Sequence, residues 1–242
     1  MTNKNMNFFA KKLVAAFLNN KIIKPIPKIY TSKLIKANSF RKLCESKIKK
    51  PIIGFKAGGT AIPLIKKLKE KEPFYASVYK HNVLKNNSLV KKTKYTLGIE
   101  LEVCYLIKKD FFNLQKIITE KNLNKVISHI GPCIEVVGYR QRKKGIKSFG
   151  DLCSDFGGNI KFVIGKLKKY TRNNVKNLKT NISNLNTIIQ LMVTLIQLRE
   201  SHEIFNICFK KTSKGQNKSQ KRFLRFHRLN CRGRSYFEQR YL

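Results

Sequence analysis

Apolar residues recur at helical spacing near the start of the chain and at strand spacing further on. Between residues 7 and 20 they return every three to five positions, which predicts an amphipathic helix. A connector with two prolines follows, and Thr31 or Ser32 is placed to cap a second helix over residues 33–46. We therefore expect residues 1–50 to form an N-terminal helical region.

From residue 51 the pattern changes to short apolar runs separated by glycine and asparagine turns. Strands are predicted at PIIGFKAGGTA, YASVYKHNVL, TLGIELEVCYLI, GPCIEVVGY and the end of FGDLCSDFGGNIKFVIG, whose first part is a glycine-rich loop. Helices are predicted over residues 61–70 and 113–130. This mixture predicts an α+β fold built around a mixed β-sheet.

The pattern ends near residue 187. Residues 188–242 show no sustained period of 2 or 3.6 and almost no turn signals between apolar groups. We therefore divide the chain into the helical region, a core over residues 51–187 and an atypical basic tail over residues 188–242.

The composition is that of a soluble, cytoplasmic protein. The 242 residues are 42% hydrophobic, enough for a core, and no run approaches the roughly 18 apolar residues that cross a bilayer, so we expect no membrane association. The six cysteines include no C-x-x-C pair and no histidines at zinc spacing, which indicates reduced thiols. The basic, apolar start allows a targeting peptide, but it lacks an A-x-A-like cleavage site, and an ordinary first helix is favoured.

The chain is strongly basic. It has 52 Lys and Arg against 13 Asp and Glu, a net charge of +39, which suggests nucleic acid or an anionic membrane as a partner. The excess is spread as single lysines and accompanies abundant Asn and Ile, a composition typical of AT-rich codons at neutral positions. Nucleic-acid binding is kept as an alternative function, and the charge by itself does not establish it.

Two carboxylates lie inside an apolar run of this basic chain. In GIELEVCYLI, Glu100 and Glu102 are two residues apart, so a strand places them side by side on one face. A third acid, Glu135, lies in the apolar segment CIEVVGY. Hard oxygen ligands in a small cluster suit Mg²⁺ or Mn²⁺. The spacing is equally compatible with solvent-facing glutamates paired with lysines, and both interpretations stay open on this evidence alone.

Five short motifs occur in an order that resembles one enzyme group. They are GFKAGGTA, EPFYASVYKHNV, IELEVCYLI, GPCIEVVGYR and DFGGNIKFVIG. Together they are similar to the 2-keto-4-pentenoate (2-oxopent-4-enoate) hydratase group of the fumarylacetoacetate hydrolase superfamily, over about residues 10–187. The resemblance implies a fumarylacetoacetase-like mixed β-sheet core, preceded by N-terminal helices, and makes residues 51–187 a hydratase-like catalytic core.

The resemblance also assigns the acidic cluster. It implies that Glu100, Glu102 and Glu135 are ligands of Mg²⁺ or Mn²⁺. Lys56 matches the family lysine beside the substrate, which implies a catalytic and substrate-binding role.

Three further residues fall at family positions near the pocket, with roles that the resemblance defines less fully. Arg140 is expected to bind substrate and Asp155 to be catalytic. His81 replaces the Asp of many members; it is either a base or a surface histidine in a polar turn. Gly138 stands where the family often has Asp, and these two departures leave the substrate open.

The implied reaction is the addition of water to a 2-hydroxy-2,4-dienoate such as 2-hydroxypenta-2,4-dienoate, giving a 4-hydroxy-2-oxo acid. Related enzymes of the superfamily decarboxylate 2-oxo acids or hydrolyse C–C bonds, and these are the alternative activities. Relatives generally assemble as homo-oligomers, so we expect one here.

The sequence of residues 188–242 suggests translation in a shifted reading frame. Similar proteins continue with an N-G strand, a G-[NH]-P helix start and a late T-G-S strand, which are missing from residues 188–242. With permitted codons, LRESHEIFNICFKK and KRFLRFHRLNCRGRSYFEQRYL read one nucleotide later give GNPMKYSIFALKK and DFFVSTGSTVGVVPISNKGI. We hypothesise a frameshift. It predicts an incomplete or irregular C-terminal part, and a chain that binds Mn²⁺ weakly or aggregates.

Overall fold

The computed structural model describes residues 3–60, 66, 73–108, 122–141, 145–171, 179–184, 187–192 and 224–228. Its helices and 3₁₀ turns are α1 Asn3–Leu18, α2 Lys28–Thr31, α3 Leu34–Ser46, η1 Lys80–Asn82, α5 Leu123–Val126, α6 Phe149–Ser154 and η5 Phe156–Gly158. Its strands are β1 Ile52–Gly58, β2 Phe74–Tyr79, β3 Val83–Lys85, β4 Thr96–Ile107, β5 Ile127–Gly138, β6 Asn159–Ile164, β7 Lys168–Lys169, β8 Lys179–Asn184, β9 Thr187–Met192 and β10 Leu224–Arg228.

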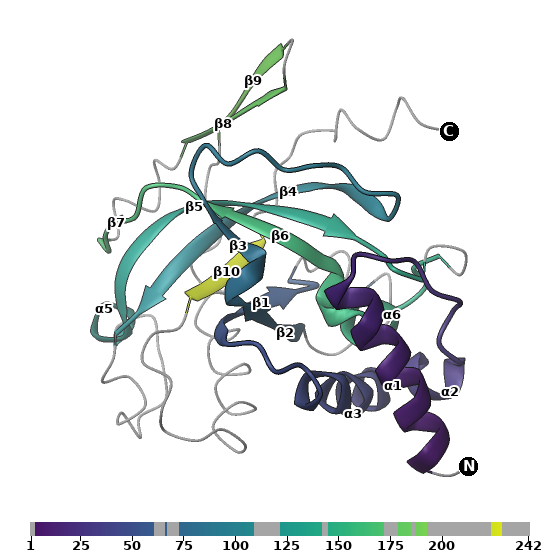
Figure 1. Cartoon of the computed structure of the whole chain (residues 1–242). Coiled ribbons are helices and arrows are strands. Elements are labelled where there is room, and N and C mark those ends of the chain that lie inside the picture. The colour runs from purple at the N-terminus through teal and green to yellow at the C-terminus, as the bar shows by residue number, and fades with distance from the viewer. Residues whose placement is uncertain are drawn as a thin grey trace.

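Eight of the described strands form one mixed sheet, in the order β2-β1-β10-β4-β5-β6-β3, with β7 paired to β5 (Figure 1). The two edge strands, β2 and β3, are joined in the chain by the three residues of η1. So short a connection between opposite edges requires the sheet to curl back on itself. Strands β8 and β9 pair with each other in a separate two-stranded sheet.

The curled sheet surrounds an interior filled from several strands. Val78 of β2, Cys104 of β4, Cys133 of β5 and Phe162 of β6 form one buried cluster. Residues that alternate with them along each strand point to the opposite face. Glu102 and Glu135, two residues from Cys104 and Cys133, therefore lie on this interior face.

The N-terminal helices cover one end of the sheet, next to α6 (Figure 1). Leu13 and Phe17 of α1 and Phe40 of α3 share a buried cluster with Tyr79 of β2 and Phe156 of η5. The apolar face of the first helix is thus buried against α3, the end of β2 and η5. This packing fixes the turn at residues 155–158, which borders the site described below.

Both predicted N-terminal helices are present, as α1 and α3. The predicted cap of the second is wrong: Lys33 is the residue before α3, and it makes no side-chain hydrogen bond to the helix end. A side-chain cap does occur at α6, inside the segment predicted as a loop, where Ser148 accepts a hydrogen bond from the backbone N–H of Asp151.

The helix predicted over residues 113–130 is wrong for its last four residues. Residues 127–130 belong to β5, which pairs with β4 from Ile127 to Gly138, and ladder hydrogen bonds with a long neighbour outweigh local helical spacing. Only the short α5 precedes this strand, and residues 113–121 lie outside the described part. The helix predicted over 61–70 also lies outside it, apart from Lys66.

Part of the tail is in the sheet. Strand β10 lies between β1, to which it is parallel, and β4, to which it is antiparallel. The rest of the region after residue 192 lies outside the described residues. None of the described helices is long and apolar enough to span a membrane.

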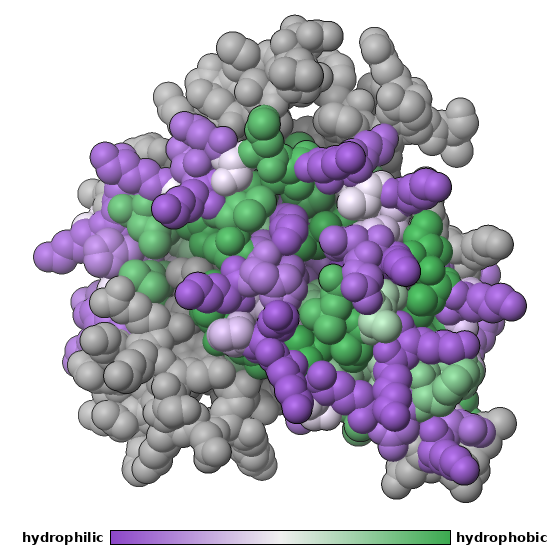
Figure 2. Space-filling model, in the orientation of Figure 1, coloured by the Kyte–Doolittle hydropathy of each residue, from purple (hydrophilic) through white to green (hydrophobic). Residues whose placement is uncertain are grey.

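Hydrophilic and hydrophobic side chains are both exposed on the described part of the face shown in Figure 2, with hydrophobic areas lying between the hydrophilic ones.

Candidate metal centre

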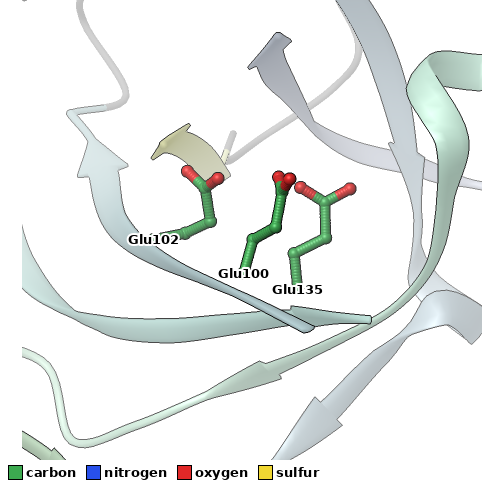
Figure 3. Close-up of side chains that lie close together, drawn as sticks. All are labelled: Glu100, Glu102 and Glu135. Atoms are coloured by element: carbon green, nitrogen blue, oxygen red, sulfur yellow. The ribbon is translucent and has the colours of Figure 1, made fainter. Parts of the chain in front are cut away.

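Three glutamates converge on one point inside the curled sheet. Glu100 and Glu102 come from β4, and Glu135 comes from β5, where it is the register partner of Glu100. Their carboxylates point into a common space (Figure 3), with one oxygen from each within 4.8 Å of the others. The cluster requires only two paired strands, because alternation puts residues 100 and 102 on one face and pairing adds residue 135.

The glutamates are not solvent-facing positions of an amphipathic strand. Glu102 is 2% exposed and Glu135 is fully buried, while Glu100 is partly buried. Leu101 and Val103, on the opposite face of β4, are buried as well. Burying carboxylates this close together costs free energy unless positive charge compensates them.

Lys56 of β1 supplies one compensating charge. Its Nζ donates to both carboxylate oxygens of Glu135, at 2.6 and 2.7 Å, and to the carbonyl of Gly157 at 3.1 Å. Burial on its own would lower the pKa of Lys56, but the attraction of Glu135, Glu100 and Glu102 outweighs burial and raises the pKa above its usual value. Lys56 is therefore a buried ammonium ion.

This donor set fits a divalent cation. Three negative carboxylates and one positive ammonium leave a net charge of −2, which one divalent ion neutralises. The ligand atoms are all hard oxygens, the type that Mg²⁺ and Mn²⁺ prefer. Glu100, Glu102 and Glu135 are the residues that would hold the ion.

A cavity of about 210 Å³ adjoins the cluster. Its polar side chains are Lys56 and Glu100. Its apolar side chains are Ala57, Phe74, Leu97, Val137, Ile146 and Leu152. The cavity therefore offers charged groups at one wall and hydrocarbon elsewhere, which suits a small acid with an apolar chain.

Glycine at position 157 keeps this arrangement open. Its backbone is left-handed (φ 72°), and a Cβ there would lie 3.1 Å from the Cβ of Ala76 and 3.3 Å from Cδ of Lys56. A side chain would therefore press on the lysine whose ammonium group bonds to the carbonyl of this residue.

Arg140 and Asp155 form a buried ion pair beside the cavity, and neither residue lines it. Asp155 accepts hydrogen bonds from Nη1 of Arg140 at 2.9 Å and from its backbone N–H at 2.6 Å. Burial raises the pKa of Asp155, and the attraction and hydrogen bonds of Arg140 reduce this rise without cancelling it. The guanidinium also donates to the carbonyl of Asn159 and lies 4.8 Å from the ring centroid of Phe17.

These contacts tie the segment that follows β5 to the turn at residues 155–158 and to α1, which is a structural role. The predicted catalytic role of Asp155 and substrate-binding role of Arg140 stay predictions.

His81 lies in η1, outside the cavity lining. Its ring centroid is 5.9 Å from those of Phe17 and Tyr79, and its carbonyl accepts a hydrogen bond from Lys161. Burial lowers the pKa of His81, and the positive charges of Lys161 and Lys50 lower it further. The structure thus places His81 at a helix–sheet contact, and its role as a base stays a prediction.

Comparisons with known proteins find similarity in structure only. No protein-family model and no curated protein sequence matches the chain. A 4-oxalocrotonate decarboxylase from Pseudomonas putida G7, solved with magnesium and adipate, superposes with a TM-score of 0.73 at 12% identity, over 95% of this chain and 89% of that one. The same enzyme solved with calcium and acetate gives 0.60 at 16% identity, over 73% and 67%. The chain has the fumarylacetoacetate hydrolase fold.

The predicted α+β, fumarylacetoacetase-like fold class is therefore confirmed. The finer assignment to the hydratase group is not decided by these matches, because identities this low establish the fold alone.

Within this fold, the departure at Gly138 has a local explanation. A Cβ at this position would lie 2.4 Å from Cδ1 of Ile160 and 2.5 Å from the carbonyl oxygen of Tyr95. The end of β5 packs directly on the Tyr95 backbone, so the Asp found in many members would have to displace it.

Sequence reasoning missed the neutral parts of the site. No sequence motif identifies the Gly157 carbonyl or the apolar residues of the cavity wall as parts of a binding site. The pair Gly157–Gly158, both at positive φ, was a readable signal of a tight turn after Asp155.

Proposed function

We propose that this chain is a divalent-metal-dependent lyase, specifically a hydro-lyase that adds water to a 2-hydroxy-2,4-dienoate such as 2-hydroxypenta-2,4-dienoate. The observation that carries the proposal is the cluster of three carboxylates and one ammonium at the wall of an otherwise apolar cavity. The order of the sequence motifs supports the hydratase reaction over others of the same fold.

The carboxylates and the lysine have different roles. Glu100, Glu102 and Glu135 hold Mg²⁺ or Mn²⁺, which when bound supplies Lewis acidity that stabilises negative charge on an oxygen of the acid. Lys56 keeps its proton because its pKa is raised, so it suits pairing with a carboxylate and donating hydrogen bonds better than acting as a base.

The cavity walls complete the site. Phe74, Leu97 and Leu152 contact the hydrocarbon part of the acid and keep bulk water away from the charged groups. A small cavity lined in this way admits a short-chain acid and orients it with its oxygens toward Lys56 and toward the metal ion that Glu100 would help to hold.

Decarboxylation of a 2-oxo acid is the second candidate. The structural neighbour described above, solved once with magnesium and adipate and once with calcium and acetate, is a 4-oxalocrotonate decarboxylase. The two reactions need the same stabilisation of an enol oxygen, so the carboxylate cluster supports them equally.

The test is turnover by the purified chain with Mg²⁺ or Mn²⁺. With 2-hydroxypenta-2,4-dienoate, a hydratase removes the ultraviolet absorbance of the conjugated acid and forms 4-hydroxy-2-oxopentanoate without releasing gas. With 4-oxalocrotonate, a decarboxylase releases one CO₂ per molecule. Headspace or coupled CO₂ measurement separates the two activities.

Matched variants connect turnover to the cluster. Glu102→Gln keeps the shape of the side chain and removes one ligand charge, so turnover should fall by about 100-fold or more. Glu45→Gln removes the counter-ion of the buried Arg41 on α3, away from the cluster, so it controls for a loss of stability alone: it should lower Tm and retain turnover below that Tm. Equal activity of wild type and Glu102→Gln, or no turnover of either acid with either metal, would contradict the proposal.

A further inference from the structure

The ammonium group of Lys56 has no donor left for a ligand. It carries three N–H bonds. They are directed to Oε1 of Glu135, Oε2 of Glu135 and the carbonyl of Gly157.

The lysine therefore occupies the carboxylate that a metal ion needs. Both oxygens of Glu135 accept from the same ammonium group, and one of them belongs to the set that could hold an ion. An ammonium ion and a divalent cation on one carboxylate repel each other, and this repulsion is strong in a poorly solvated interior.

We propose that Lys56 is a built-in counter-ion that competes with the divalent cation for Glu135 and so sets the metal affinity of the site. The inference rests on the proposed function, because it takes the carboxylate cluster as the metal site. Metal binding at Glu135 displaces the ammonium from at least one oxygen, and the Gly157 carbonyl retains it beside the cavity. The displaced N–H is then available to the carboxylate of an acid bound in the cavity.

Binding order follows from this competition. Without metal, Lys56 is saturated and a carboxylate ligand finds no donor on it. With metal bound, the ligand gains a hydrogen bond from Lys56, and the ligand in turn holds the lysine away from Glu135. Metal and anionic ligand therefore strengthen each other's binding by the same factor.

The experiment measures Mn²⁺ binding to the full-length chain by electron paramagnetic resonance of the free ion, without substrate and without turnover. Lys56→Gln keeps a donor for Glu135 and removes the charge, and Lys56→Met removes both. Each variant should bind Mn²⁺ at least about tenfold more tightly than wild type. The control Lys161→Met removes a positive charge from β6, where Lys161 bonds to the carbonyl of His81, and should leave the affinity unchanged.

A second measurement uses the wild type alone, so it does not depend on the variants folding. Nitrogen-15 NMR of lysine side chains should show a slowly exchanging ammonium signal for Lys56, because it is buried and fully bonded. Saturating Mg²⁺ should shift that signal or speed its exchange.

The outcomes separate this inference from the proposed function. Mn²⁺ binding that is weakened by Glu102→Gln and is equal or weaker in both Lys56 variants overturns the competition and leaves the metal site intact. An ammonium signal unchanged by Mg²⁺ saturation also overturns it. Absence of Mn²⁺ binding by the wild type and every variant rejects the proposed function and this inference together.

Discussion

Replacing Asp155 with Asn tests whether this residue holds the fold or takes part in chemistry. The carboxylate accepts from the backbone N–H of Arg140 through Oδ2 and from Nη1 of the same residue through Oδ1. An amide has only one oxygen, so in either orientation its NH₂ group faces one of these two donors. The variant also leaves the guanidinium of Arg140, which is 1% exposed, without its counter-ion.

The expected loss of stability is large. Removing one partner of a buried ion pair costs about 3–5 kcal/mol. For a chain of this length, 1 kcal/mol changes Tm by about 2–4 °C, so Tm should fall by roughly 6–20 °C. Arg140→Met should cost a similar amount, because it leaves the carboxylate buried alone.

The assay is a double-mutant cycle followed by thermal and urea unfolding. The cycle compares Arg140→Met, Asp155→Leu and the double variant that carries both. The double variant removes both charges and should be clearly more stable than the sum of the two single losses predicts. Asp155→Asn that unfolds within about 1 kcal/mol of wild type would refute the structural role. If such a stable variant had also lost turnover, the predicted catalytic role of Asp155 would gain support instead.

Four other predictions follow from single features. Gly138→Ala should destabilise the chain by about 1–3 kcal/mol in urea unfolding because it overpacks Tyr95 and Ile160, whereas Gly98→Ala, with nothing within 4 Å of the added carbon, should cost less than that. The lowered pKa of His81 means that the unfolded state takes up the proton first, so Tm should fall as pH drops through about 6.5, and less steeply in His81→Gln. Mn²⁺ at about 100 times its Kd should stabilise the wild type by about 2.7 kcal/mol, reversibly with a chelator and not in Glu102→Gln. Nucleotide sequencing from codon 185 to codon 242 should show a frame change within codons 185–200 and, after it, codons that spell the missing family motifs one nucleotide later; an intact frame with unrelated codons would end the frameshift hypothesis.

The carboxylate cluster could be predicted because it depends on short-range rules. Alternation on a strand places Glu100 beside Glu102, and Glu135 lies in a second apolar strand. That these two strands pair, with Glu100 opposite Glu135, is long-range information that no local pattern contains. The placement of Glu135 beside Glu100 and Glu102 was predicted from the resemblance, which rests on the order of the motifs.

The same limit explains the errors. Residues 127–130 have helical spacing, but the partner strand β4 decides their conformation. The sequence resemblance placed Arg140 and Asp155 near the substrate, but in the structure they form an ion pair with each other. The partner of a buried charge depends on which residues the fold brings together, and a local sequence pattern does not contain this information.

Strand β10 shows why the tail matters to the site. The segment LRFHR alternates apolar and polar residues for only a few positions, too short a pattern to distinguish it from the rest of the tail. It nevertheless lies between β1, which carries Lys56, and β4, which carries Glu100 and Glu102. The spacing between ammonium and carboxylates is therefore set partly by a strand from the region that the frameshift hypothesis regards as altered. A change that weakens the pairing of β10 with β1 and β4 should move Lys56 away from the carboxylates first. Strands β4 and β5 pair directly, so Glu100, Glu102 and Glu135 should stay close together after Lys56 has moved away.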